Sequence, residues 1–252
     1  MLAALFSGCA TTVDPRTTID HRLRGTGQPV VVFQSGLGDG LSVWQTVSAR
    51  TETMATTLAY SRSGYGSSPA VHGERSACAV AKEQHTLLQN LGLKPPFVLV
   101  GHSLGGLYQY AFAKLYPQEV AGVVLLEPTH PDLLASLRRE VPASGSMLAL
   151  ARFTFSAPMR REFDDQTLCL NDLAKMAMPP APVRLLVRGS FTGLEAGAFE
   201  TVARRLEQDW LRLLGTPSLQ RVERAGHYIQ KDRPDAVVDA VAAVLDAARP
   251  VR

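Results

Sequence analysis

Residues 97–106 read FVLVGHSLGG and carry the clearest indication of the fold of this chain. The apolar run 97–100 is typical of a buried β-strand, and residues 107–114, LYQYAFAK, are typical of a helix. Between them, two glycines flank Ser103 in the spacing G-x-S-x-G. The stretch therefore predicts a strand, a sharp turn and a helix in direct succession.

The tight turn places Ser103 in a demanding backbone conformation. Side chains at positions 101 and 105 would crowd the neighbouring strand and helix, so glycine suits both positions. The turn directs the Ser103 hydroxyl away from the sheet, and the start of the next helix leaves unpaired backbone N–H groups close to it. This arrangement is a nucleophile elbow, and it makes Ser103 the candidate nucleophile.

Length and composition indicate one compact domain. The 252 residues are enough to bury a large core, and the hydrophobic fraction of 46% and the charged fraction of 19% are ordinary for a globular protein. The net charge is only +3 and the basic residues cluster no further than pairs, so we expect no nucleic-acid partner. The sequence has no recognisable metal-ligand cluster or dinucleotide-binding fingerprint, so we expect no metal and no cofactor.

The first residues differ from the rest of the chain. Residues 1–16 resemble the end of a bacterial lipoprotein signal followed by a tether, because Ser7 and Gly8 precede Cys9, the residue that such signals lipidate. A lipidated Cys9 would tether the protein to a membrane, in the periplasm; a cytoplasmic protein with an accidental similarity is the alternative. The remaining cysteines, Cys78 and Cys169, would form a disulfide in an exported protein and stay thiols in the cytoplasm.

Residues 17–252 alternate between strand-like and helix-like stretches. This alternation predicts a single α/β domain with a mostly parallel, doubly wound sheet. Strands are expected at 17–24, 29–33, 56–60, 97–100, 120–126, 183–187 and 219–222, and helices at 44–52, 77–91, from the serine turn to Pro117, at 199–214 and at 234–248.

One stretch, residues 128–182, interrupts the alternation. It has helical character but no signal of a buried strand, and it carries methionine and phenylalanine side chains among polar residues. Two interpretations remain open. The segment is either a set of helices that pack on one another or a lid that turns apolar faces toward a substrate.

From Val30 to Val244 the chain resembles the α/β-hydrolase superfamily, and within it small bacterial enzymes of the serine esterase or lipase type. The resemblance rests on the serine turn and on residues 35–38 (SGLG), 60–67 (YSRSGYGS), 125–131 (LLEPTHP) and 226–228 (GHY). It implies the α/β-hydrolase fold with a helical lid inserted after the sixth strand, at about 128–182, and a small-molecule ester or acyl substrate. Ser61 departs from the superfamily pattern, which has aspartate there, at a position that usually shapes a loop.

A serine hydroxyl needs a base to remove its proton during attack. Of the six histidines, His102 adjoins Ser103, but neighbouring strand residues point to opposite faces, so its ring cannot easily reach the hydroxyl. His227 follows the last expected strand, and catalytic residues lie beyond the carboxyl ends of strands in open α/β sheets. The chain order serine, acid, histidine of the superfamily also selects His227 as the base.

An oxyanion hole needs two backbone N–H donors directed at the developing negative charge. The serine turn supplies one donor, from Leu104. The glycine-rich loop after the strand 29–33 supplies the other, and the resemblance points to the amide of Leu37.

The third member of a serine–histidine–acid triad is the carboxylate that orients the histidine, and three residues of this chain are candidates for it. Most relatives place it just after the strand that is here 183–187, but Glu195 is the first acid there and lies some way along. Glu127 follows the strand 120–126 directly, nearer the serine, and some superfamily members take their acid from that strand. We favour Glu127 over Glu195, with Asp132 as a further candidate.

These residues predict a serine hydrolase that cleaves carboxylic esters or related acyl compounds through an acyl-enzyme. Lactone opening, thioester cleavage, perhydrolysis and C–C bond hydrolysis use the same triad and remain open. Dehalogenation and epoxide opening are disfavoured because those relatives carry a carboxylate where this chain has Ser103. A non-catalytic binding protein on the same scaffold is the alternative from another class, and the oligomeric state is not predicted.

Overall fold

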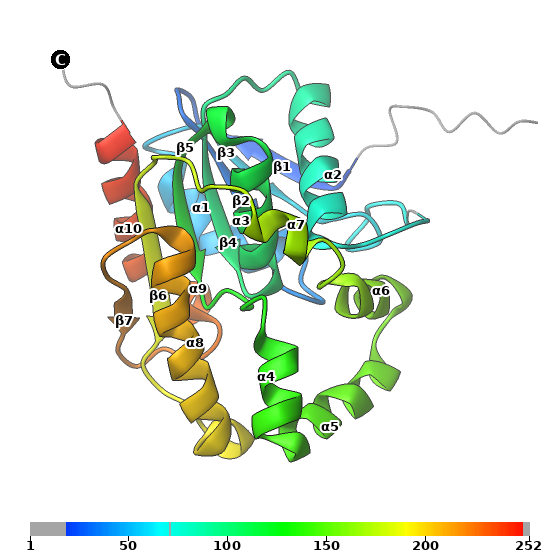
Figure 1. Cartoon of the computed structure of the whole chain (residues 1–252). Helices are drawn as coiled ribbons and strands as arrows, with labels where there is room; N and C mark the ends of the chain where they lie inside the picture. Colours follow the sequence, from blue (N-terminus) through cyan, green and yellow to red (C-terminus); the bar gives the residue numbers. More distant parts are fainter. Residues whose placement is uncertain (1–18, 71, 249–252) are drawn as a thin grey trace, which may run out of the picture.

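A seven-stranded sheet forms the centre of the computed structural model, which describes residues 19–70 and 72–248 (Figure 1). The strand order is β1-β3-β2-β4-β5-β6-β7, and only β1 runs antiparallel to its neighbour. The strands are β1 (His21–Arg24), β2 (Val30–Gln34), β3 (Thr57–Tyr60), β4 (Phe97–His102), β5 (Val120–Leu126), β6 (Val183–Arg188) and β7 (Gln220–Val222).

Helices cover both faces of the sheet, as the alternating sequence predicts. On one face α2 (Ala77–Asn90), α3 (Leu104–Leu115) and α8 (Ala198–Leu214) pack over the sheet, and on the other face lie α1 (Gln45–Thr51) and α10 (Pro234–Ala248). The central strands β2 and β4 are buried along their whole length because both of their faces meet helices. The protein thus has the α/β-hydrolase fold, and the bounds predicted for β5 and α10 agree with the structure to the residue.

The short elements complete the chain. Strand β1 pairs with β3 rather than with β2, so the turn at residues 25–27 leads to a new position in the sheet and not to a hairpin. Helix α9 (Ile229–Asp232) follows His227. The 3-10 turns are Leu41–Trp44, Pro117–Glu119, Arg152–Thr154 and Gly193–Glu195.

Residues 128–182, which we call the helical insertion, connect β5 to β6. They contain α4 (Leu133–Glu140), α5 (Pro142–Ala151), α6 (Ala157–Asp165) and α7 (Leu170–Ala174). The superfamily resemblance places the insertion after a sixth strand, and the structure does not confirm this position. Among the described residues the insertion follows the fifth strand, β5, and precedes the sixth, β6.

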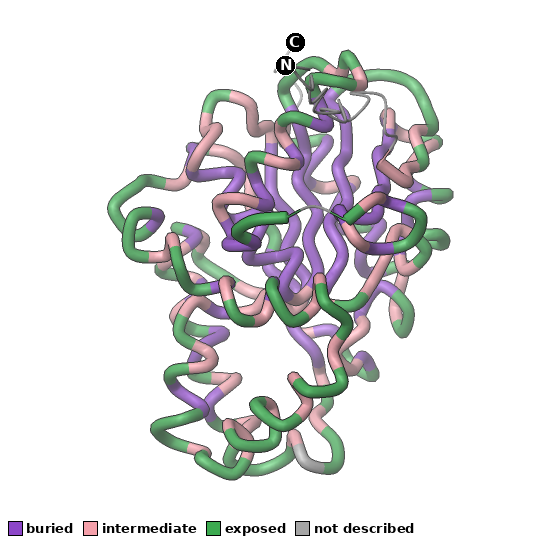
Figure 2. Tube along the Cα trace, turned by 90° about the vertical axis from the view of Figure 1, so that its right-hand side faces the viewer, coloured by how far each residue is buried: buried purple, intermediate pink, exposed green. Residues whose placement is uncertain are grey.

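The insertion extends beyond the carboxyl end of the sheet. Figures 1 and 2 show α4 and α5 projecting away from the strands, and α5 has no buried residue. Helix α4 nevertheless packs on the body, because Leu137 forms a small apolar cluster with Val202 and Leu206 of α8. Helices α4 and α8 therefore form two walls beside the carboxyl edge of the sheet.

Two of the three cysteines lie in the described part of the chain. Cys9 and the predicted lipoprotein remnant, residues 1–16, lie outside the described residues. Cys78 at the start of α2 and Cys169 before α7 are joined by a disulfide across 91 positions of sequence, one of the two states that the sequence leaves open for this pair. None of the helices in the described ranges combines the length and the hydrophobicity needed to cross a bilayer.

Candidate active site

The carboxyl ends of the parallel strands bring the predicted site residues to one edge of the sheet. Ser103 follows β4, Glu127 follows β5, and His227 follows β7. Parallel strands end at the same edge, so residues that are 124 positions apart, such as Ser103 and His227, become neighbours.

Ser103 occupies the strained turn that its flanking glycines predict. Its φ of 54° and ψ of −123° lie outside the regions favoured by residues with a side chain. A β-carbon at Gly101 would lie 2.6 Å from the carbonyl oxygen of Gly105, and one at Gly105 would lie 2.3 Å from the carbonyl oxygen of Gln34. Only glycine fits at these two positions, so the turn cannot relax without moving β2 or α3.

His227 lies against the Ser103 hydroxyl. The distance from its Nε2 to Ser103 Oγ is 3.1 Å, within the range of a hydrogen bond. His102 holds the loop that carries His227, because its Nε2 donates to the backbone carbonyl of His227 over 2.8 Å. Burial, reinforced by the neighbouring His227, keeps the pKa of His102 well below its ordinary value, so His102 is a neutral support.

Glu127 approaches the other side of the His227 ring. Its backbone also has a positive φ, 46°, and its Oε2 lies 3.7 Å from His227 Nδ1. That distance exceeds a hydrogen bond, and Nδ1 has no hydrogen-bond partner among the described residues. Catalytic hydrogen bonds are often long in a protein without its substrate, so the separation does not remove Glu127 from consideration.

Arg188, the last residue of β6, is the partner of Glu127 that sequence reasoning missed. Its backbone N–H donates to Glu127 Oε1 and its Nε to Oε2, both over 2.6 Å. Burial would raise the pKa of Glu127, but the His227 ring and the Arg188 guanidinium outweigh burial and hold this pKa below its ordinary value. Glu127 is therefore a carboxylate at neutral pH. The sequence did contain a signal for this pair: Arg188 ends an apolar strand, and a buried arginine needs an acidic partner nearby.

The two other candidate acids lie elsewhere. Glu195 accepts a hydrogen bond from Arg188 Nη1 over 2.6 Å, and its side chain is 44% exposed. Asp132 donates its backbone N–H to Nδ1 of His130 over 3.0 Å. Neither forms a hydrogen bond with His227 within the described part of the chain, so Glu127 is the acid that the fold brings nearest to the base.

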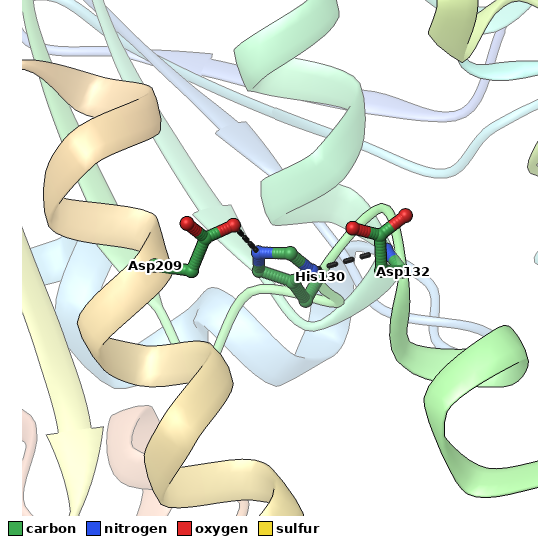
Figure 3. Close-up of side chains that lie close together, drawn as sticks. All are labelled: His130, Asp132 and Asp209. Atoms are coloured by element: carbon green, nitrogen blue, oxygen red, sulfur yellow. Dashed lines mark hydrogen bonds and ion pairs between the residues drawn. The ribbon is translucent and has the colours of Figure 1, made fainter. Parts of the chain in front are cut away.

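His130 lies between Asp132 and Asp209, and together these three residues offer ligand atoms within 4.8 Å of one another (Figure 3). Both ring nitrogens already have partners: Nδ1 accepts from the Asp132 backbone, and Nε2 lies 3.1 Å from Asp209 Oδ2. The Asp209 carboxylate also accepts two hydrogen bonds from Arg212. The group is a satisfied hydrogen-bond network that ties the start of the insertion to α8, and it supplies no evidence for a metal site.

The residues expected to donate to an oxyanion flank Ser103. Leu104 is the first residue of α3, so its N–H precedes the hydrogen-bonded turns of the helix. The loop that contains Leu37 lies against the serine, since a β-carbon at Gly36 would be only 3.2 Å from Ser103 Cβ. Gly36, the residue before Leu37, thus lies beside Ser103, and Leu104 follows Ser103 directly in the chain.

A cavity of about 150 Å³ opens beside Ser103 and His227. Its walls come from the ends of β5 and β6, from α4 and from α8. Most of the lining is apolar, and the apolar side chains are Pro128, Leu133, Val187, Phe199, Ala203, Leu206 and Trp210. Such a cavity suits the hydrocarbon part of a small ligand.

This fold, with a serine on a sharp turn at the carboxyl edge of its sheet, defines a hydrolase of the α/β class. The chain belongs to the Alpha/beta hydrolase family, whose model matches residues 30–240. Among curated proteins it is similar to the uncharacterized protein YqjL of Bacillus subtilis, with 26% identity over 90% of this chain and 87% of YqjL.

Solved structures share the fold at lower identity. A thermophilic esterase from Thermogutta terrifontis superimposes with a TM-score of 0.64 and 19% identity, covering 91% of this chain and 93% of the esterase. A monoacylglycerol lipase from Paleococcus ferrophilus gives a TM-score of 0.61 and 22% identity, covering 92% of this chain and 99% of the lipase. Family and fold together support hydrolase activity for this protein.

Proposed function

We propose that this protein is a serine hydrolase that cleaves small carboxylic esters or related acyl compounds. The observation that carries the proposal is the 3.1 Å contact between His227 Nε2 and the Oγ of Ser103, a serine held at a φ of 54° at the sheet edge. A base within hydrogen-bond distance of a hydroxyl on a strained turn is the arrangement that activates serine for attack.

In the proposed reaction, Ser103 Oγ attacks the acyl carbon while His227 Nε2 takes the hydroxyl proton. The negative charge that develops on the carbonyl oxygen is stabilised by the N–H groups of Leu104 and Leu37. His227 then donates the proton to the leaving alcohol, and an acyl-enzyme remains on Ser103. Water, deprotonated by His227, hydrolyses that acyl-enzyme and restores the serine.

Glu127 has the role of the acid in this proposal. An ionised carboxylate beside Nδ1 keeps the ring in the tautomer that presents Nε2 to the serine, and it stabilises the imidazolium that forms during attack. The lowered pKa of Glu127 supports this role, because the group must carry its charge at the working pH. A movement that shortens the 3.7 Å separation from Nδ1 would form the hydrogen bond.

The test combines covalent labelling with hydrolysis. The wild-type protein is treated with a fluorophosphonate probe and assayed on p-nitrophenyl esters of increasing acyl length. We expect one equivalent of label on Ser103 and hydrolysis of the short esters, with both lost in Ser103→Ala and hydrolysis lost in His227→Ala. Full esterase activity in a folded Ser103→Ala variant would refute the proposal, and no label or hydrolysis in the wild type would favour a binding protein.

A further inference from the structure

Arg62 is a completely buried cation behind the candidate oxyanion loop, residues 35–37. Its side chain has 0% exposure. Its Nη1 donates to the carbonyl oxygen of Ser35 over 2.5 Å, and its Nη2 donates to the carbonyl oxygen of Gly36 over 2.8 Å. The guanidinium therefore binds two successive carbonyl groups of the loop that lies against Ser103.

The bond to Gly36 bears directly on Leu37. The Gly36 carbonyl and the Leu37 N–H belong to the same peptide unit, which is planar, so the two groups point in opposite directions. Fixing the carbonyl oxygen toward Arg62 thereby fixes the direction of the Leu37 N–H. A rotation of this peptide would move the N–H away from any oxyanion at Ser103.

Arg62 is in turn held by the helical insertion. Glu162 of α6 accepts two hydrogen bonds from Arg62: Nε donates to Oε1 over 2.9 Å, and Nη2 donates to Oε2 over 2.8 Å. The side chain of Glu162 is also 0% exposed. Tyr65 donates its hydroxyl to Glu162 Oε2 over 2.8 Å, and Arg75 donates to Oε1 over 3.0 Å. A bidentate pair of this kind defines the orientation of the guanidinium plane.

The charges around Glu162 are balanced. Arg75 also pairs with Glu83 of α2, so two arginines face two glutamates in one connected group. Burial would raise the pKa of Glu162, but Arg62 and Arg75 outweigh burial and hold this pKa below its ordinary value. Helix α6 touches the same loop region a second time, since a β-carbon at Gly38 would lie 3.1 Å from Met159 Cε.

We infer that Glu162 is a positioning residue: through Arg62 it sets the Gly36–Leu37 peptide, so that the helical insertion helps build the oxyanion hole of the body. The inference rests on the proposed function, in which Leu37 donates to the oxyanion. It assigns a role in turnover to a residue of α6 that touches neither Ser103 nor His227 in the described contacts.

The decisive variant is Glu162→Gln, which keeps the side-chain volume and removes the charge. Its matched control is Asp164→Asn on the same helix, where the aspartate pairs with Arg152 at the surface. For Glu162→Gln we expect kcat on a short p-nitrophenyl ester to fall about tenfold to a hundredfold, with KM changed less than about threefold. Asp164→Asn should keep wild-type kcat and KM.

Inhibitor affinity distinguishes a specific loss of oxyanion stabilisation from a general disturbance of the active site. A trifluoromethyl ketone adds to the serine and places a negatively charged oxygen in the hole, so its affinity should fall by the same factor as kcat. A product-like alcohol, which makes no oxyanion, should bind equally well to wild type and variant. Circular dichroism and thermal unfolding verify that the variant is folded.

Removing one partner of a buried ion pair can prevent folding. Glu162→Asp retains the charge but shortens the side chain by one methylene, and it replaces Glu162→Gln in the same comparison if the glutamine variant does not fold. A folded variant with kcat and ketone affinity within twofold of wild type would overturn the inference while leaving the proposed function intact. A wild type with no hydrolysis dependent on Ser103 would overturn both.

Discussion

At the scale of single residues, the carboxylate of Glu127 binds Arg188 and faces the ring of His227 without a hydrogen bond to it. Arg188 binds both of its oxygens over 2.6 Å, whereas His227 Nδ1 is 3.7 Å away. Arg188 thus holds Glu127 ionised and in a fixed orientation beside the ring. Arg188 also binds Glu195, through Nη1 over 2.6 Å, whereas Glu127, the acid that the sequence favours, is the one that lies beside the His227 ring.

Glu127→Gln should lower kcat by about three to four powers of ten, because a neutral amide cannot stabilise the imidazolium and can favour the wrong tautomer of His227. Glu195→Gln should stay within about threefold of wild type, since this half-exposed side chain contacts Arg188 rather than the ring. Steady-state kinetics of both variants, each verified by circular dichroism, measures the difference. A large loss confined to Glu195→Gln would show that the acid lies after β6.

At the scale of elements, α8 shapes the cavity beside Ser103. Apolar cavities of about 150 Å³ accept a molecule of about the size of benzene, so we expect kcat/KM to be highest for short acyl chains of up to about six carbons. Ala203→Leu should reduce activity on hexanoate and butanoate esters while acetate hydrolysis is retained, because the larger side chain occupies the cavity. Gln208→Leu, on the exposed side of α8, serves as the control.

The profile of activity against acyl length checks this expectation. If Ala203→Leu and Gln208→Leu gave the same profile as the wild type, the cavity would not be the acyl site. A shift of the optimum toward acetate in Ala203→Leu alone supports the assignment.

Helix α6 should contribute to stability in a pH-dependent way. The pKa of Glu162 is lower in the folded protein than its ordinary value of 4.5, because Arg62 and Arg75 outweigh the effect of burial. The unfolded state therefore binds a proton more readily, and the stabilisation is present above about pH 4.5 and is lost as the pH falls through the lower folded-state pKa.

Urea unfolding at a series of pH values between about 6 and 3 measures this dependence. The wild type should lose stability more steeply below pH 4.5 than Glu162→Gln, which has no proton to take up at this site. Asp164→Asn should change the pH dependence of the unfolding free energy less than Glu162→Gln does, because the ion pair of Asp164 with Arg152 is exposed and screened. Parallel curves for the wild type and Glu162→Gln would contradict the expected linkage.

At the scale of the whole molecule, the disulfide joins the body to the end of the insertion. Cys78 lies in the first turn of α2 and Cys169 directly precedes α7. The bond between them closes a loop across 91 sequence positions. A bond that closes so long a loop restricts the unfolded chain and should stabilise the fold by about 4–5 kcal/mol. Reduction, or a Cys78→Ser/Cys169→Ser double variant, should therefore lower the urea midpoint.

Intact mass after alkylation, with and without reductant, measures the state of the two thiols. The bonded protein should take up two more alkyl groups after reduction at Cys78 and Cys169 than before it. Two freely alkylated thiols in a protein prepared under oxidising conditions would exclude the bond and remove the expected loss of stability on reduction.

The sequence by itself determined the elements whose cause is local. Strand β5 and helix α10 have their predicted bounds because apolar periodicity and proline define them over a few neighbouring residues. The turn at Ser103 was predictable because the need for glycine at 101 and 105 is a matter of local crowding. The order of Ser103, Glu127 and His227 along alternating strands also predicts that they lie at one edge of the sheet, because parallel strands end at the same edge.

Only the tertiary structure decided how side chains far apart in the sequence pair with one another. Arg62 and Glu162 are 100 positions apart, and Arg188 is 61 positions from Glu127, so neither pair leaves a pattern along the chain. An arginine at the end of a strand can form an ion pair with any acidic residue that the neighbouring strands place at the same edge of the sheet. Which acid it meets depends on strand order, register and the course of the insertion, and these are set by the packing of the whole domain.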